Sequence, residues 1–124
     1  LETIKNYNVN SVIIVLNNQG YGLIKQTQET WLKSVYAGTD KSSGLSLPNN
    51  IKVASSYGIK SFTLKNNDDV KKNIKKILNF KGPILVDVLI DPKSRVKPKI
   101  EYGKPLQDMY PYISKLKLKE IMKK

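Results

Sequence analysis

The chain alternates short apolar runs with longer amphipathic stretches. Apolar runs at residues 11–16, 61–64 and 84–91 are rich in β-branched side chains. Runs of this kind predict buried strands of a parallel sheet. Helical patterns lie between them, over residues 1–8, 21–34, 50–57 and from 66 to the Gly82-Pro83 pair. This order predicts an α/β fold with three α/β/α layers and a mostly parallel sheet.

The last of these helices has the clearest pattern. Its start, "NNDD" at 66–69, offers amides for the cap and carboxylates for the positive end of the helix dipole. An apolar stripe is predicted from Val70, Ile74, Ile77 and Leu78, with Lys71, Lys72, Lys75 and Lys76 on the solvated side. In the preceding helix, Asn50 is predicted to be the N-cap and Gly58 the stop.

The length of 124 residues corresponds to one domain. The sequence opens on Leu1 in the middle of a helical pattern, so we expect an N-terminally truncated piece of a longer protein. We assign residues 1–112 to the domain and 113–124 to a basic C-terminal tail, either a frayed helix or disordered. Cysteine and histidine are absent from the sequence, which excludes disulfides and thiolate or imidazole chemistry.

The net charge of +12 raises the question of nucleic-acid binding. Only Arg95 among the 22 basic residues is an arginine, and the lysines are dispersed, so a solvated basic surface is favoured. Tyr102, Tyr110 and Tyr112 are expected to pack on the domain or on a neighbouring subunit rather than stack on bases. No apolar run has the length of a membrane span, and no secretory pattern opens the sequence, so we expect a cytoplasmic protein without membrane partners.

Candidate chemistry lies where the first strand ends, in "VIIVLNNQGYG". Ligands of open parallel sheets bind beyond the carboxyl ends of the strands. There, the Asn18 amide oxygen suits Mg²⁺, while Gly20 and Gly22 let the backbone approach a bulky anion. A helix that begins after them would favour phosphate at its N-terminus. Considered alone, these residues favour an ordinary turn over a ligand site.

Several segments resemble one family. "LNNQGYG" at 16–22 resembles the second half of the thiamine diphosphate motif, which begins with Gly-Asp-Gly and closes with Asn-Asn. The similarity extends to "IKQTQETW", "GLSLPNNIKVASSYGIK", "GPILVDVLIDP" and "GKPLQDMYPYI". The chain therefore resembles the C-terminal thiamine diphosphate-binding domain of enzymes related to the acetolactate synthase large subunit.

The resemblance implies roles for five residues. Asn18, through its side-chain oxygen, and Gly20, through its carbonyl, would be Mg²⁺ ligands. Tyr21 and Gly22 would lie along the diphosphate, and Leu23 would lie against the cofactor rings. No residue of this chain is implied to be catalytic. Asn17 is expected to cap the turn, and Gln26 and Gln28 either face the substrate entrance or have a solvated or capping role.

The resemblance also implies an activity for the longer parent. It would decarboxylate a 2-oxo acid, with pyruvate the expected donor, and transfer the acyl unit to a carbonyl acceptor, as a homodimer or tetramer. FAD could bind in another domain of the parent. The Gly-Asp-Gly half is absent from this sequence, so we expect the chain alone to bind cofactor weakly and to be inactive. The alternatives are a simple 2-oxo acid decarboxylase and a basic α/β binding module without cofactor.

Three further positions carry expectations. Thr27 stands where the family has the tryptophan of "Gln-Trp-Gln", which implies room for a larger acceptor such as a keto-sugar. Asp87, inside a strand, is either a site residue or, as we favour, an acceptor of backbone or lysine hydrogen bonds. Asp40 is expected to form a turn within the polar loop 37–50, a loop that we expect to be mobile without ligand.

Overall fold

The computed structural model describes residues 1–123, which divide into two compact units. The first unit covers Leu1–Ser94 and the second begins at Arg95. The first unit contains the sheet and the candidate loop, whereas the second holds one helix, α5 (Lys115–Met122). The predicted division into a domain at 1–112 and a tail at 113–124 stays a prediction.

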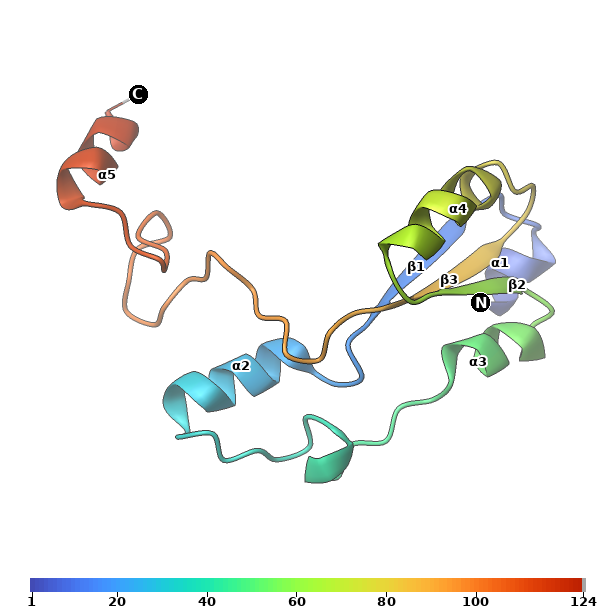
Figure 1. The fold of residues 1–124 in the computed structure, drawn as a ribbon, viewed down its shortest axis with the longest axis horizontal. Coiled ribbons are helices and arrows are strands. Elements are labelled where there is room, and N and C mark those ends of the chain that lie inside the picture. The colour runs from blue at the N-terminus through green and yellow to red at the C-terminus, as the bar shows by residue number, and fades with distance from the viewer. Residues whose placement is uncertain (124) are drawn as a thin grey trace. The chain divides into compact units, whose positions relative to one another are not determined.

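The first unit follows the predicted order of helices and strands (Figure 1). In chain order its elements are α1 (Glu2–Asn6), β1 (Val12–Asn17), α2 (Gly22–Trp31), the 3₁₀ turn η1 (Lys41–Ser43), α3 (Asn50–Ser56), β2 (Lys60–Leu64), α4 (Asn67–Leu78) and β3 (Ile84–Leu89). The α/β class is therefore confirmed, and the observed elements differ from the predicted ones by a few residues at their ends.

The sheet is parallel, with β3 at its centre. Both β1 and β2 pair with β3, so that Val12 and Lys60 lie opposite Ile84 on its two sides. β3 is buried from Ile84 to Asp87. β1 is an outer strand, and the side chains of Ile14 and Leu16 are more than half exposed. The expectation that the first strand is buried is wrong for these two residues, because α4 packs over β2 and β3 rather than over β1.

Two separate apolar clusters lie on opposite faces of β3. Leu85 packs with Ala54 of α3 and with Ile59, while the next residue, Val86, packs with Ile77 of α4 and with Leu64 of β2. Neighbouring residues of a strand point to opposite faces. The sheet is thus covered by α3 on one face and α4 on the other, which gives the expected three layers (Figure 1).

Asparagine side chains begin both of these helices. The Asn66 side chain accepts a hydrogen bond from the Asp69 N–H at 2.9 Å, as predicted for α4. In α3 the cap is Asn49, which accepts from the Lys52 N–H at 2.9 Å, so the prediction of Asn50 as the cap is wrong. The reason is that Asn50 lies inside the helix and its amide is engaged by a side chain of β3, described below.

The apolar stripe of α4 is narrower than predicted. Val70 and Ile77 pack into the core, whereas Leu78 is 62% exposed and its inclusion in the stripe is wrong. Leu78 is turned by about 100° from Ile77 on the helix, which carries it past the covered face. The predicted solvated side is confirmed, because Lys71, Lys72, Lys75 and Lys76 are all exposed.

The second unit contains its own contacts. Its helix α5 is capped by Ser114, which accepts from the Lys117 N–H at 3.3 Å, so the Lys-rich end is helical. The rings of Tyr110 and Tyr112 meet edge to face, with centroids 5.8 Å apart. The Tyr112 hydroxyl donates to the Glu101 carboxylate, and this bond raises the pKa of Tyr112 to about 12. Packing of these tyrosines on a neighbouring subunit stays a prediction.

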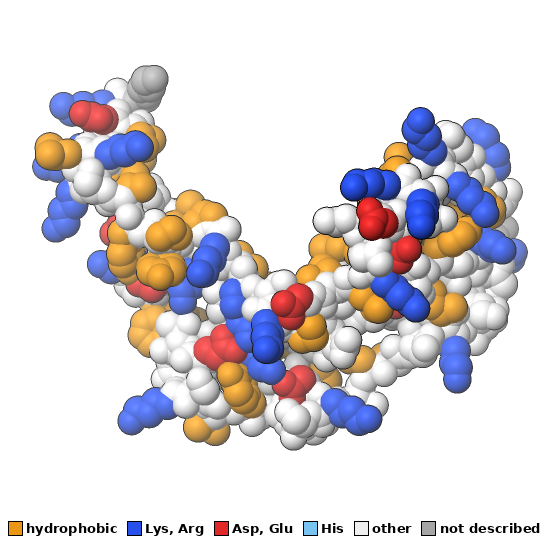
Figure 2. Space-filling model, viewed as in Figure 1, with side chains coloured by type: hydrophobic (Ala, Val, Ile, Leu, Met, Phe, Trp, Pro, Cys, Tyr) orange, Lys and Arg blue, Asp and Glu red, His pale blue; other side chains and the backbone are white. Residues whose placement is uncertain are grey.

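Basic side chains form no single stripe on the face of the protein that Figure 2 draws. Figure 2 shows lysine and arginine side chains dispersed among uncharged ones on the face that it draws. Within residues 1–123, no helix combines the length and the apolar character that crossing a membrane requires.

Adjacent positions of α4 test the assignment of the core. Ile77 is 1% exposed and Leu78 is 62% exposed. Ile77→Ala should lower the free energy of unfolding by roughly 2–5 kcal/mol, because it leaves a cavity between α4 and the sheet. Leu78→Ala, the matched control, should change it by less than about 0.5 kcal/mol. Urea unfolding measures both, and equal losses in the two variants would contradict this packing.

Candidate functional site

The loop after β1 is shaped by its two asparagine side chains. Asn17 Oδ1 accepts a hydrogen bond from the Gln19 N–H at 3.0 Å, and Asn18 Oδ1 accepts one from the Gly20 N–H at 3.3 Å. Side-chain amides that bond two residues ahead turn the chain in this way. Gln19 itself has a φ of 59°, in the left-handed region. The predicted turn cap at Asn17 is confirmed, and Asn18 forms a second turn of the same kind.

Both glycines of the motif are required by close approach. A Cβ on Gly20 would lie 2.4 Å from the carbonyl oxygen of Thr39, and one on Gly22 would lie 2.4 Å from Asn18 Nδ2. The loop is fixed to Thr39 by the hydrogen bond from the Tyr21 N–H to the Thr39 carbonyl, at 2.8 Å. Gly20 therefore lets two segments meet, while Gly22 leaves space for the Asn18 side chain at the start of α2.

The second wall of the site is the loop 37–50. Asp40 caps η1 in a capping box: its carboxylate accepts from the Ser43 N–H, and the Asp40 N–H donates in return to the Ser43 hydroxyl. The expected turn at Asp40 is therefore confirmed. Asp40 also forms an ion pair with Lys25 of α2. The Lys25 ammonium, with the Ser42 and Ser43 hydroxyls, holds the pKa of the Asp40 carboxyl well below its usual range. The charge of Asp40 is thus stabilised by Lys25, and α2 is linked to the loop. The mobility expected for this loop stays a prediction.

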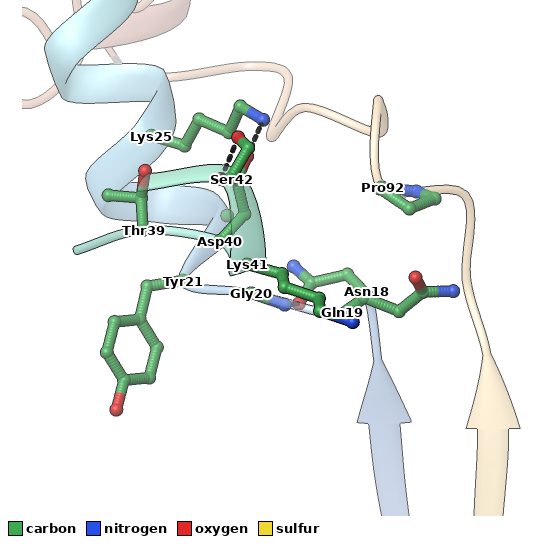
Figure 3. Close-up of a pocket in the computed structure, with 11 residues that line it drawn as sticks. Asn18, Gln19, Gly20, Tyr21, Lys25, Thr39, Asp40, Lys41, Ser42 and Pro92 are labelled. Atoms are coloured by element: carbon green, nitrogen blue, oxygen red, sulfur yellow. Dashed lines mark hydrogen bonds and ion pairs between the residues drawn. The ribbon is translucent and has the colours of Figure 1, made fainter. Parts of the chain in front are cut away.

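A cavity of about 250 Å³ lies between these two segments (Figure 3). It brings together four of the residues implied by the resemblance, Asn18, Gly20, Tyr21 and Gly22. Sequence reasoning missed its other wall, formed by Lys25, Thr39, Asp40, Lys41, Ser42 and, after β3, Pro92. The spacing Asp40-x-x-Ser43 is a capping-box signal in the sequence, but it does not indicate which segment the turn will meet.

Leu23 is the predicted residue that this cavity does not include. It lies exposed on the first turn of α2, outside the lining. A second hollow, of about 580 Å³, is lined by Asn17 and Gln19 of the loop, by Lys41 and by residues 44–48. Gln19 and Lys41 line both cavities, so they stand between them.

Asp87 lies at the base of this edge of the sheet. It is 6% exposed and accepts hydrogen bonds from the amide of Asn17, at 3.1 and 3.2 Å, and from that of Asn50, at 2.8 Å. The expectation of backbone or lysine donors is wrong. The donors are two asparagine side chains, because β1 and α3 bring them to the same face of β3.

Gln28 and Thr27, neighbours in α2, differ in their surroundings. Gln28 is buried, and its amide bonds both to the Ala37 carbonyl, at 3.1 Å, and to the Ala37 N–H, at 3.4 Å. Gln28 therefore holds the chain that follows α2, so the solvated role is wrong for it, and the choice between the substrate entrance and a cap stays a prediction. Thr27 is exposed, and its hydroxyl donates to the Leu23 carbonyl at 3.1 Å.

Comparison with known proteins identifies the family. Residues 1–88 match the family described as "Thiamine pyrophosphate enzyme, C-terminal TPP binding domain". The chain belongs to this thiamine diphosphate enzyme family. The match covers the sheet up to Val88, the loop after β1 and every residue of the cavity wall except Pro92.

Curated relatives of this thiamine diphosphate domain include acetolactate synthases. The chain is 32% identical to the mitochondrial acetolactate synthase of Schizosaccharomyces pombe over 106 residues, which is 86% of the chain and 15% of that protein. It is 30% identical to the acetolactate synthase large subunit of Cyanidium caldarium, over 94% of the chain and 20% of that protein. The chain thus spans a fifth or less of the length of these relatives.

The residues of the cavity fit a diphosphate cofactor linked to a metal ion. Asn18 presents an amide oxygen, a donor that Mg²⁺ accepts, and the cavity opens at the first turn of the ten-residue helix α2. Within residues 1–123, no three carboxylate, imidazole or thiolate side chains form a cluster. The donors that this chain offers there are therefore the Asn18 amide oxygen and backbone carbonyls, beside the Asp40 carboxylate, which is paired with Lys25, and the ammonium group of Lys41.

The two glycines form a matched pair for testing the loop. Gly20→Ala should lower the free energy of unfolding by roughly 1–3 kcal/mol, because the new methyl meets a backbone carbonyl that cannot move alone. Gly22→Ala should cost about 1 kcal/mol or less, since the Asn18 amide can rotate away at the loss of one hydrogen bond. Urea unfolding compares them. A larger loss for Gly22→Ala than for Gly20→Ala would contradict the loop geometry.

Proposed function

We propose that this chain is the cofactor-binding part of a thiamine diphosphate- and Mg²⁺-dependent enzyme. The full-length parent decarboxylates a 2-oxo acid, with pyruvate as the donor, and transfers the acyl unit to a carbonyl acceptor. One observation carries the proposal: four motif residues of the matched family line a single cavity at the carboxyl edge of a parallel sheet. The acetolactate synthases among the relatives support the reaction class.

Each residue of the cavity has a defined part in this proposal. The Asn18 side-chain oxygen and the Gly20 carbonyl hold the metal ion, and Tyr21 and Gly22 border the diphosphate at the start of α2. Thiamine diphosphate, when bound, supplies the electron sink for decarboxylation. The protein binds it, orients it and keeps water away from the reacting atoms. Leu23, on the exposed side of the same helix turn, provides an apolar contact for its rings.

Lys41 is a further anion-binding residue that the sequence did not reveal. Lys25 is paired with Asp40, whereas Lys41 forms no ion pair within the described residues 1–123. Its side chain runs along the loop toward Gly20 and Gln19 (Figure 3). An ammonium group in this position favours a diphosphate in the cavity.

The site of this chain is incomplete on its own under this proposal. Gly-Asp-Gly, which carries the charged metal ligand in the family motif, does not occur in the sequence. The 124 residues alone should therefore bind cofactor weakly and remain inactive. The parent is proposed to be a cytoplasmic homodimer or tetramer, acting on small-molecule substrates without nucleic-acid or membrane partners. A parent that only decarboxylates is the second candidate, and product analysis separates the two.

Calorimetric titration tests the cofactor site in the full-length parent. Mg²⁺ and thiamine diphosphate should bind together, and Asn18→Ala should weaken binding at least about tenfold, because a metal ligand is lost. Asn79→Ala is the matched control: it changes an exposed asparagine at the end of α4, at the opposite edge of the sheet, and should bind as the wild type does. Absence of Mg²⁺-dependent binding by the wild-type parent would reject the proposed function.

The acceptor preference is set by Thr27 in this proposal. Thr27 is exposed one turn after Leu23, which leaves room for an acceptor larger than pyruvate. Thr27→Trp should lower kcat/KM for larger ketone acceptors by roughly 10–100-fold relative to pyruvate. Thr30→Trp, one turn further along α2 with the same bond to the helix backbone, is the control. A wild-type parent that uses pyruvate as acceptor and rejects larger ketones would contradict this assignment.

A further inference from the structure

Asp87 is a buried charge in an unusual setting. Although the chain carries 22 basic residues, Asp87 forms no ion pair within residues 1–123. Its carboxylate accepts instead from two neutral amides, those of Asn17 and Asn50. A buried charge is costly unless it is hydrogen-bonded, so these amides are held firmly. The negative charge itself is not neutralised by a cation.

The three side chains meet because of the parity of the strands. Asp87 lies on the face of β3 that carries Leu85, two residues before it, and Asn17 lies on the face of β1 that carries Val15. This is the face covered by α3, whose first residue is Asn50. Asp87 thus joins the end of β1, the end of the 37–50 loop and the centre of the sheet at one point.

Hydrogen bonds connect Asp87, through Asn17, to the turn that carries Asn18, the candidate metal ligand. Asn17 Nδ2 donates to both oxygens of the Asp87 carboxylate. This orients Asn17 Oδ1 toward the Gln19 N–H, from which it accepts at 3.0 Å. The turn formed in this way carries Asn18, whose own oxygen accepts from the Gly20 N–H. The orientation of one amide therefore fixes the backbone on both sides of Asn18.

We propose that Asp87 is a positioning residue that, through Asn17, holds the 17–20 loop in the conformation in which Asn18 can bind a divalent cation. Its un-neutralised charge also favours a cation at this edge of the sheet. The effect on Mg²⁺ rests on the proposed function, whereas the effect on the loop does not. Partners of this kind, one step behind a metal ligand, typically change metal affinity by about 10–100-fold when they are removed.

The bonding pattern can be tested by swapping the side chains at positions 17 and 87. In Asp87→Asn, the new amide oxygen can still accept from Asn50 and Asn17, but its NH₂ group then faces the Asn17 Nδ2 donor where the second carboxylate oxygen stood, at 3.2 Å. This donor–donor contact pushes the Asn17 amide away and weakens its hold on the Gln19 N–H. In Asn17→Asp, two carboxylates face one another. In the double variant Asn17→Asp/Asp87→Asn, a hydrogen bond can again join residue 87 to residue 17 and to Asn50, and residue 17 to the Gln19 N–H. The new amide accepts from Asn50 and donates to the new carboxylate, which still accepts from Gln19. The total charge is also unchanged. Asp91→Asn, an exposed substitution of the same kind just after β3, is the control.

Two measurements test the proposal. The first is amide hydrogen exchange at Gln19 and Gly20 in the 124-residue chain without cofactor. Each single variant should speed amide hydrogen exchange at these residues about tenfold or more. The double variant Asn17→Asp/Asp87→Asn and the control Asp91→Asn should match the wild type. The second is the Mg²⁺ affinity of the parent at saturating thiamine diphosphate. This affinity should fall about 10–100-fold in Asp87→Asn and return to within about threefold of wild type in the double variant Asn17→Asp/Asp87→Asn.

The outcomes separate this proposal from the function itself. Unchanged exchange at Gln19 in Asp87→Asn would overturn it. Normal Mg²⁺ binding by the parent with Asp87→Asn would also overturn it. So would a double variant that recovers thermal stability but not Mg²⁺ affinity, because that is the result expected if Asp87 has only a structural role. If exchange responds as expected but the wild-type parent binds no cofactor, the loop-positioning role stands and the proposed function fails.

Discussion

The carboxyl edge of this sheet is organised by one buried charge, the Asp87 carboxylate. Asp87 must be hydrogen-bonded because it lies inside the central strand, and the donors available there are asparagine amides from β1 and α3. Meeting this requirement orients Asn17, which turns the chain at Gln19 and places Asn18 at the cavity. The interior of the fold and its candidate site are thus connected through a single side chain.

The remaining wall of the site is brought in by contacts between segments distant in sequence. Gly20 allows the loop after β1 to meet Thr39, and the Lys25–Asp40 pair ties α2 to the same segment. Asp40 thereby balances Lys25, which leaves Lys41 as the cation beside the loop. The site therefore combines neutral oxygen donors, a carboxylate already paired with Lys25, a helix N-terminus and a further ammonium group, a set suited to a metal-linked diphosphate.

Local sequence signals predicted the elements well, because helix and strand periods are properties of neighbouring residues. The Asn-Asn-Gln-Gly turn was predicted for the same reason. Asn49 and Asn50 are chemically identical as caps, so only the contact with Asp87 decides which of them begins α3. The exposure of Ile14 and Leu16 follows from strand order, and the Lys25–Asp40 pair follows from the path of a loop. Neither is encoded in a local pattern.

The most direct measurement is a crystal structure of the full-length parent grown with Mn²⁺ in place of Mg²⁺ and with thiamine diphosphate. The anomalous signal of manganese locates the metal independently of any assumption about its ligands. We expect a metal peak within about 2.0–2.3 Å of the Asn18 side-chain oxygen, in the range for oxygen ligands, with Asp87 still accepting from Asn17. A metal and diphosphate bound elsewhere, with Asn18 contacting neither, would contradict it.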